Sequence, residues 1–142
     1  MLTIHWRLYI KATNPQAAAN VLGRVCISLS PTTHIIQLKP YWKDEALFEA
    51  TLVTDLDDDD IRSGVFTALR LGMKLARAWT VSGPHAFDRD IWQFDGYAAE
   101  RDGFTVAGVT LASFELLPSE EGENAPSPSD RTGYGMSLDN GD

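Results

Sequence analysis

The residues near the start of the chain alternate strictly between apolar and polar side chains, and this alternation constrains the fold more than any other feature. The apolar positions between Thr3 and Ala12 are Ile4, Trp6, Leu8, Ile10 and Ala12. A period of two over about ten residues predicts a β-strand with one buried face and one polar face. The chain therefore builds at least part of its core on a sheet that is covered on one side only.

Four later segments show the same kind of pattern. The expected strands are His34–Trp42, Ala46–Thr54, Asp90–Ala98 and Phe104–Leu117. Pro40 cannot donate a backbone hydrogen bond, so its strand should lie at an edge of the sheet. Three tryptophans fall at inward positions of these strands, and we expect them to anchor the core: Trp6, Trp42 and Trp92.

Two segments have helical periodicity. The first follows Asn14-Pro15, a favourable helix start, and its apolar stripe is Ala18, Val21, Leu22, Val25 and Leu29. The second is a long helix predicted over Asp57–Val81, and Ser82-Gly83-Pro84 should end it. Its predicted buried face is Ile61, Val65, Leu69, Gly72, Ala76 and Trp79. A second stripe of small residues predicts close packing of this helix: Gly64, Ala68, Gly72 and Ala76.

The order of these elements is βαββαβ with one additional C-terminal strand. This order predicts the α+β class and a ferredoxin-like sandwich, with two helices on one face of an antiparallel sheet and the other face open to solvent. Residues 1–117 form the predicted single domain. Residues 118–142 are rich in Ser, Gly, Pro and acids and poor in apolar residues, so we expect an acidic disordered tail.

The charge of the chain is −8 at pH 7 and is unevenly spread. Residues 1–117 hold 11 Lys and Arg against 14 Asp and Glu, whereas residues 118–142 hold one Arg against six acids. This balance argues against nonspecific nucleic-acid binding and fits either a soluble protein or one whose partner is basic. Cys26 is the only cysteine, so no disulfide forms within the chain, and we expect a buried, inert thiol. Without a recognisable signal peptide or long apolar run, the expected location is cytoplasmic and no membrane contact is expected.

The acidic run Asp55–Asp60 invites comparison with a calcium-binding loop. Counted from Asp55, the sixth position is Asp60 instead of glycine and the twelfth is Phe66 instead of glutamate. We therefore expect no metal or other cofactor. The run is then either a solvated helix cap or a docking site for a protein partner.

The ferredoxin-like topology would bring this run close to a second acidic loop. In that topology the strand before the long helix and the strand over Asp90–Ala98 end at the same edge of the sheet. The predicted partner-binding residues at this acidic end are Asp57, Asp58, Asp59, Asp60, Glu100 and Asp102. Like charges repel, so a cluster of them favours a functional explanation.

The open face of the sheet is a second candidate surface. Its expected outward residues are Arg7, Tyr9, Lys11, Lys39, Tyr41 and Tyr97. Aromatic and basic residues on such a face are typical of RNA-recognition modules, but the RNA-binding motif is absent and Glu49 points outward. Tyrosine is also common on exposed strands, and Tyr and Arg are frequent in protein interfaces.

Residues that could perform catalysis are few. His85 lies near Asp88 and Asp90 in an expected polar loop, and a His–Asp pair could transfer protons. A surface histidine without a catalytic role is the simpler interpretation, and none of the common catalytic motifs is present. We therefore expect a binding protein and not an enzyme.

The small acidic domain has the general character of a known group of proteins. Stretches such as TIHWRLYIKATNP, YWKDEALFEATLV and IWQFDGYAAERDGF resemble bacterial immunity proteins of contact-dependent growth inhibition and related polymorphic toxin systems. The resemblance implies an immunity protein that binds and neutralises a toxin, in many cases a nuclease with a basic cleft. The alternative is a ferredoxin-like regulatory or small-ligand-binding domain that acts as a homodimer.

Overall fold

The described residues of the chain form six strands, two α-helices and one short 3-10 helix. The computed structural model describes residues 2–57, 59–86 and 92–118, so the predicted tail over 119–142 lies outside the described residues. The elements in chain order are β1 (Leu2–Lys11), α1 (Pro15–Leu29), β2 (Thr33–Pro40), β3 (Leu47–Asp55), α2 (Ile61–Leu75), β4 (Thr80–Ala86), β5 (Trp92–Ala99), η1 (Glu100–Asp102) and β6 (Val109–Pro118).

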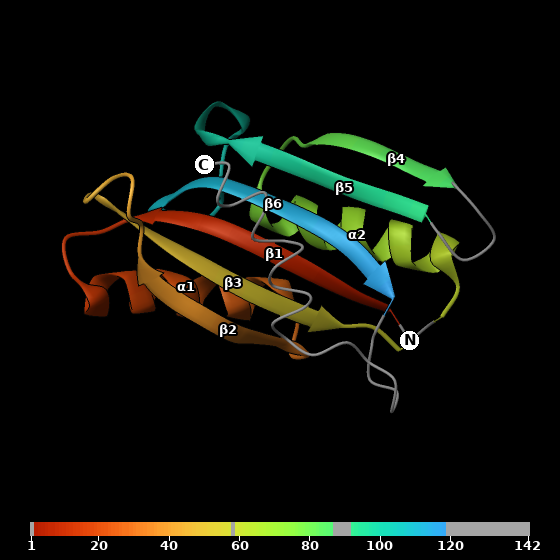
Figure 1. Cartoon of the computed structure of the whole chain (residues 1–142), viewed down its shortest axis with the longest axis horizontal. Helices are drawn as coiled ribbons and strands as arrows, with labels where there is room; N and C mark the ends of the chain where they lie inside the picture. Colours follow the sequence, from red (N-terminus) through yellow and green to blue (C-terminus); the bar gives the residue numbers. More distant parts are fainter. Residues whose placement is uncertain (1, 58, 87–91, 119–142) are drawn as a thin grey trace.

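All six strands belong to one antiparallel sheet in the order β2-β3-β1-β6-β5-β4. Both α-helices lie on one side of the sheet, behind it in the view of Figure 1, and none of the described residues forms a helix on the other side. The predicted α+β class is therefore confirmed. The strand order differs from that of the predicted ferredoxin-like sandwich, because β6 and not the strand after α2 lies beside β1. The prediction that the strand containing Pro40 is an edge strand is confirmed.

The difference in order arises from a strand that the sequence patterns did not reveal. β4 (Thr80–Ala86) pairs with β5, although its Ser82-Gly83-Pro84 sequence was read as the end of a helix. The register of the pair shifts between Ser82 and His85, and Gly83 has φ +95°, a conformation that favours glycine. The strand therefore accommodates Gly and Pro through an irregularity at the edge of the sheet.

The long helix is shorter than predicted, because contacts from distant residues end it. α2 spans Ile61–Leu75, and Ala76 is already extended. The hydroxyl of Thr105 donates to the carbonyl oxygens of Lys74 (2.7 Å) and Leu75 (3.1 Å). The Trp79 indole N–H donates to the carbonyl oxygen of Gly72 at 2.7 Å. These tertiary contacts satisfy the terminal carbonyl groups that would otherwise continue the helix.

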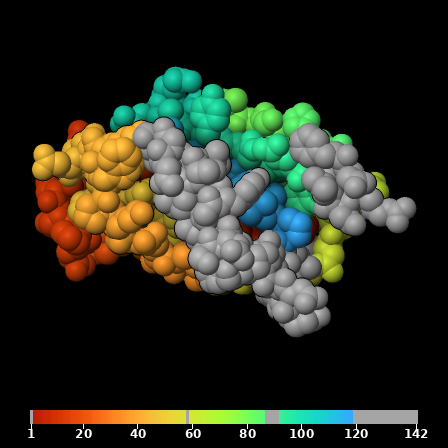
Figure 2. Space-filling model, viewed as in Figure 1, coloured from red at the N-terminus to blue at the C-terminus, as the bar shows by residue number. Residues whose placement is uncertain are grey.

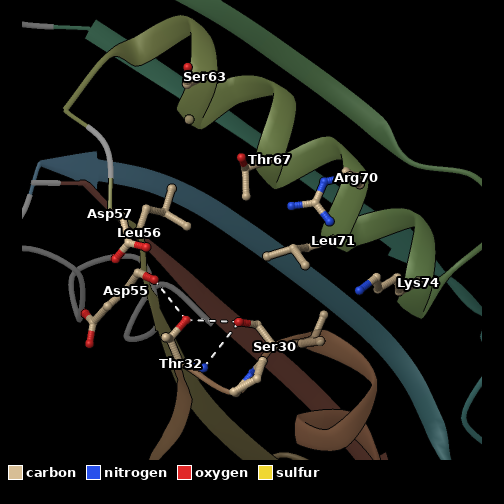
Figure 3. Close-up of a pocket in the computed structure, with 13 residues that line it drawn as sticks. Ser30, Thr32, Asp55, Leu56, Asp57, Ser63, Thr67, Arg70, Leu71 and Lys74 are labelled. Atoms are coloured by element: carbon tan, nitrogen blue, oxygen red, sulfur yellow. Dashed lines mark hydrogen bonds between the residues drawn. The ribbon is translucent and has the colours of Figure 1, made fainter.

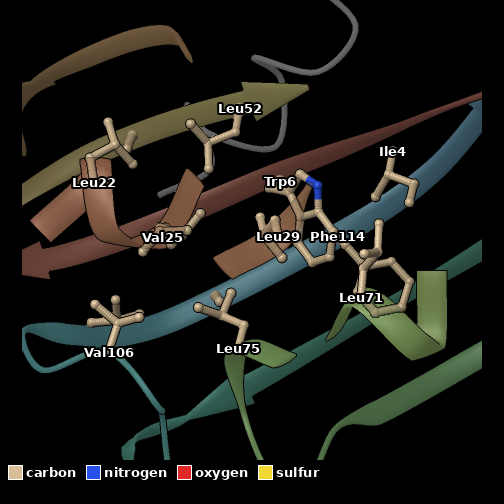
Figure 4. Close-up of a cluster of buried hydrophobic side chains, with 14 of the residues drawn as sticks. Ile4, Trp6, Leu22, Val25, Leu29, Leu52, Leu71, Leu75, Val106 and Phe114 are labelled. Carbon is tan, nitrogen blue, oxygen red and sulfur yellow. The ribbon is translucent and has the colours of Figure 1, made fainter. Parts of the chain in front are cut away.

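The core fills the space between the sheet and the helices (Figure 4). The predicted stripe of α1 is buried throughout, and the side chain of Asn14 caps this helix by accepting from the Ala17 N–H at 2.8 Å. The buried face of α2 consists of Gly64, Ala68, Leu71, Gly72 and Leu75. Gly64 packs against Leu2 and Leu116, which confirms the predicted close packing, whereas the prediction that Leu69 is buried was wrong.

Trp6 anchors this core as predicted. It is fully buried, and its indole N–H donates to Thr54 Oγ1 at 2.9 Å. Trp92 is partly buried against the same cluster. Trp42, in contrast, is 70% exposed, so its predicted core role was wrong. β2 ends at Pro40 and β3 begins at Leu47, so Trp42 lies in the connection between the two strands.

Candidate functional site

The six predicted acidic residues do not form one cluster. Asp55, at the end of β3, is paired with Thr3 of β1. Ala99, at the end of β5, is paired with Leu111 of β6, and Leu111 is paired with Tyr9 of β1. Thr3 and Tyr9 are six positions apart on one strand, which corresponds to about 20 Å. Asp57, Asp59 and Asp60 therefore lie at one end of the sheet, and Glu100 and Asp102 at the other (Figure 1). Asp58 lies outside the described residues.

The missed strand explains this correction. β4 is the outermost strand of the sheet and runs antiparallel to β5. β5 therefore runs in the direction opposite to the expected one, and its last residue lies at the opposite end of the sheet from the last residue of β3. Two of the six residues also have local structural roles. Asp60 Oδ2 accepts from the Ser63 N–H at 3.4 Å and caps α2, and Asp102 Oδ2 accepts from the Ala99 N–H at 2.8 Å.

The residues considered as an alternative acid–base pair gain no support from their placement. His85 lies in strand β4 instead of a loop, and its Nε2 is 3.2 Å from Ser82 Oγ. Asp88 and Asp90 lie outside the described residues. Across residues 2–57, 59–86 and 92–118, no group of three or more His, Cys, Asp or Glu side chains is arranged to hold a metal ion. The Cys26 thiol is half-buried, and this burial raises its pKa.

The open face of the sheet carries a continuous row of large side chains. We call it the aromatic band and define it as Trp42, Tyr41, Tyr9, Leu111 and Tyr97. Tyr9 of β1 is paired with Leu111 of β6, and Tyr97 of β5 lies diagonally from Leu111 on the same face. The band thus runs from the β2–β3 connection across β1 and β6 to β5. Trp42, Tyr97 and Leu111 are exposed large side chains.

One end of the aromatic band is held by the connection between β2 and β3. The rings of Tyr9 and Tyr41 meet edge to face, with centroids 4.7 Å apart, and Tyr41 and Trp42 are 6.3 Å apart. Asp44 orders the turn, because its Oδ1 accepts from the Ala46 N–H at 2.9 Å and its carbonyl accepts from the Leu47 N–H. Lys43 Nζ lies 5.2 Å from the centre of the Trp42 ring. Figure 2 shows this connection, coloured orange to yellow, projecting at one end of the molecule.

A buried carboxylate, Glu49, contacts the aromatic band. Glu49 of β3 is paired with Tyr9 on one side and Lys39 on the other, and it is only 6% exposed. The Tyr9 hydroxyl donates to Glu49 Oε2 at 3.4 Å, Arg7 Nε lies 3.5 Å from the same oxygen, and Lys39 Nζ lies 3.8 Å from Oε1. A buried carboxylate is tolerated when charged and polar partners surround it in this way.

A second charged group lies farther along the same face. Asp95 of β5 is paired with Glu115 of β6. Burial and the neighbouring Asp95 raise the pKa of Glu115, and Arg7 opposes this shift. The open face is therefore aromatic and cationic toward the β2–β3 connection and acidic toward the opposite end.

The residue types on this face are those that are common in protein interfaces. Tyr, Trp and Arg are the residues that most often dominate protein interfaces, and here neighbouring contacts fix several of them in place. The sequence identified most of the outward residues, namely Arg7, Tyr9, Lys39, Tyr41 and Tyr97. It missed Trp42 and the central position of Glu49. Pro40 followed closely by Asp44 is a turn signal that could have placed Trp42 outside the strand.

Comparison of the chain with protein-family models, with curated proteins and with solved structures gave no match. In the described part of the chain, neither α-helix is long and apolar enough to cross a membrane.

Proposed function

We propose that this protein binds another protein through the aromatic band on the open face of its sheet, and that it acts as an immunity protein that neutralises a toxin. The single observation that carries the proposal is the aromatic band, in which Trp42, Leu111 and Tyr97 are exposed and ring contacts join Trp42, Tyr41 and Tyr9. Exposed aromatic side chains that are already held in one conformation bind at a lower entropic cost than mobile ones. The immunity role rests on the resemblance in sequence character.

The charges on this face favour a protein over a nucleic acid. Glu49 lies at the centre of the cationic part, and Asp95 and Glu115 occupy the same face. Phosphate groups would meet these carboxylates, and the chain carries a net charge of −8. The same net charge attracts a basic protein over long distances and speeds its association. In this proposal Asp57, Asp58, Asp59, Asp60, Glu100 and Asp102 steer the partner, while the aromatic band holds it.

The test uses two aromatic residues of nearly equal exposure. Trp42 is 70% exposed within the band, and Phe66 is 68% exposed on α2, on the other side of the sheet. Each is replaced by Ala. Each variant is tested for protection of bacterial cells that express a toxin domain, which is first sought among the products of the genes that neighbour this one. Trp42→Ala should weaken binding about thirtyfold or more, as expected for a hot-spot residue, and should lose protection.

Phe66→Ala serves as the control, because it removes a similar exposed aromatic side chain outside the band. It should protect cells as well as the unmodified protein does. If both variants protect equally, the band is not the binding surface. If the unmodified protein gives no protection against that toxin domain, the immunity role itself is rejected.

A second candidate function is a regulatory or small-ligand-binding domain of ferredoxin-like type that acts as a homodimer. The uncovered edge of the sheet favours it, since β4 is exposed along most of its length and Val81 is 44% exposed. An unpaired edge strand can pair with the same strand of a second copy. A stable dimer in sedimentation experiments, broken by a charged substitution of Val81, would favour this candidate over the first.

A further inference from the structure

An open groove lies between the two helices, on the side of the sheet opposite the aromatic band (Figure 3). Its volume is about 410 Å³, within the range of small-molecule sites. The end of α1, the following turn, the end of β3 and one flank of α2 form its walls. The polar residues that line it are Ser30, Thr32, Asp55, Asp57, Ser63, Thr67, Arg70 and Lys74.

Two cations occupy one wall of the groove. Arg70 and Lys74 are four residues apart on α2, so their side chains lie on the same flank of the helix. Neither forms an ion pair with any residue that the structure describes. Two neighbouring positive charges repel each other, and an anion between them would remove this repulsion. The hydroxyl of Thr67, one turn before Leu71, lines the same wall (Figure 3).

The lining of the groove also carries negative charge. α1 ends at Leu29, and its terminal carbonyl groups carry about half a negative charge in total. The two carboxylates in the lining are Asp55, whose Oδ2 lies 3.7 Å from His34 Nε2, and Asp57. The groove therefore has a cationic side at Arg70 and Lys74 and an acidic side opposite to it. The hydroxyls of Ser30 and Thr32 bond to each other at 2.9 Å, and Thr32 Oγ1 donates to the Asp55 carbonyl oxygen at 2.9 Å, so this wall is ordered. Asp57 is exposed and lies at the other end of the groove from Lys74 (Figure 3).

We propose that this groove binds a small molecule that carries a phosphate group. Arg70 and Lys74 hold the phosphate oxygens, and Thr67 donates a hydrogen bond to them. The rest of the ligand extends toward Asp57, which accepts hydrogen bonds from an amine or hydroxyl group. This site is independent of the aromatic band, because the two lie on opposite sides of the sheet.

Titrations of the full chain, followed by amide NMR shifts at constant ionic strength, test this proposal. The probes are phosphoethanolamine, inorganic phosphate and acetate. Phosphoethanolamine should bind most tightly and should shift amides of residues 67–74 and 30–32, because its phosphate is attracted to Arg70 and Lys74 and its ammonium group to the acidic side of the groove. Inorganic phosphate should bind the same residues more weakly. Acetate should bind least of the three.

Arg70→Gln and Lys74→Gln should each weaken the binding of phosphoethanolamine about tenfold, because each removes a charge-assisted contact. Arg62→Gln is the matched control, since Arg62 is an exposed arginine of the same helix outside the groove. All three side chains are exposed. Unfolding curves recorded without any probe show whether each variant is folded. The proposal is wrong if no probe saturates, if acetate binds as tightly as phosphoethanolamine, or if Arg62→Gln weakens binding as much as the other two.

Discussion

At the scale of single residues, the open face is held together by charged side chains whose positions follow from strand register. Glu49 lies between Tyr9 and Lys39 because β3 pairs with both β1 and β2. The alternation of the sequence was sufficient to place these residues on one face. It could not show that Glu49 is buried, because burial depends on which strands become its neighbours.

The carboxyl group of Glu115 makes the stability of the folded protein depend on pH. Burial and Asp95 raise its pKa in the folded protein above the value in the unfolded chain. The folded protein therefore binds this proton more tightly than the unfolded chain does, so the group destabilises the fold as pH rises through its folded pKa. Glu115→Gln, which resembles the protonated form, should raise the unfolding temperature at pH 7.

This gain should shrink as the pH falls through the folded pKa of Glu115 toward the unfolded pKa of glutamate, below which the native residue is protonated in both states. Thermal unfolding of both proteins between pH 4 and pH 7 measures the difference. Asp44→Asn is not a suitable control because Asp44 orders a turn. Glu45→Gln, at an exposed position of the same connection, should give no comparable gain. A difference for Glu115→Gln that is constant across this range would contradict the account.

At the scale of elements, the sequence predicted both helices but misjudged the end of the second. The small residues at Gly64, Ala68 and Gly72 do form its packing face. The helix ends at Leu75 because Thr105 and Trp79 bind its last carbonyl groups. Thr105 is about thirty residues away in the sequence, so no local pattern could reveal this cap.

Two helical glycines should respond in opposite ways to alanine. A Cβ at Gly72 would lie 3.1 Å from the indole nitrogen of Trp79, which packs against Trp6 and Phe114 and so cannot easily move. Gly72→Ala should therefore destabilise the protein, by about 1–3 kcal/mol as in other overpacked sites. A Cβ at Gly23 of α1 would meet nothing within 4 Å.

Gly23→Ala should stabilise the protein by up to about 1 kcal/mol, the usual difference in helix propensity. Urea unfolding of the two variants measures both changes. Stabilisation by Gly72→Ala would show that Trp79 does not pack on this helix as described.

At the scale of the whole molecule, one missed strand altered the predicted surface. Residues 80–86 contain Gly and Pro and lack clear alternation, because β4 is exposed on both faces and its pairing is irregular. Without β4, the direction of β5 is reversed, and the two acidic loops seem to share an end. The α+β class and the position of both helices on one side of the sheet did not depend on this strand, and both were predicted correctly.

Because the two acidic loops lie at opposite ends of the sheet, we expect their neutralisation to change the rate of association with a partner more than the rate of dissociation. Asn at positions 57–60 and 102 and Gln at 100 can replace the acids, and Asn retains the capping oxygen at Asp60 and Asp102. This variant should associate more slowly with a basic partner and show a weaker salt dependence, with little change in the dissociation rate. Stopped-flow measurements at several salt concentrations test this. A large rise in the dissociation rate would show that these residues contact the partner directly.

The central claim is that the aromatic band holds the partner. The most direct measurement is the dissociation rate of the complex with the toxin domain that the protection experiment identifies, for Trp42→Ala and for Phe66→Ala. The account predicts that Trp42→Ala raises this rate about thirtyfold or more, whereas Phe66→Ala leaves it unchanged. An unchanged rate for Trp42→Ala would contradict it.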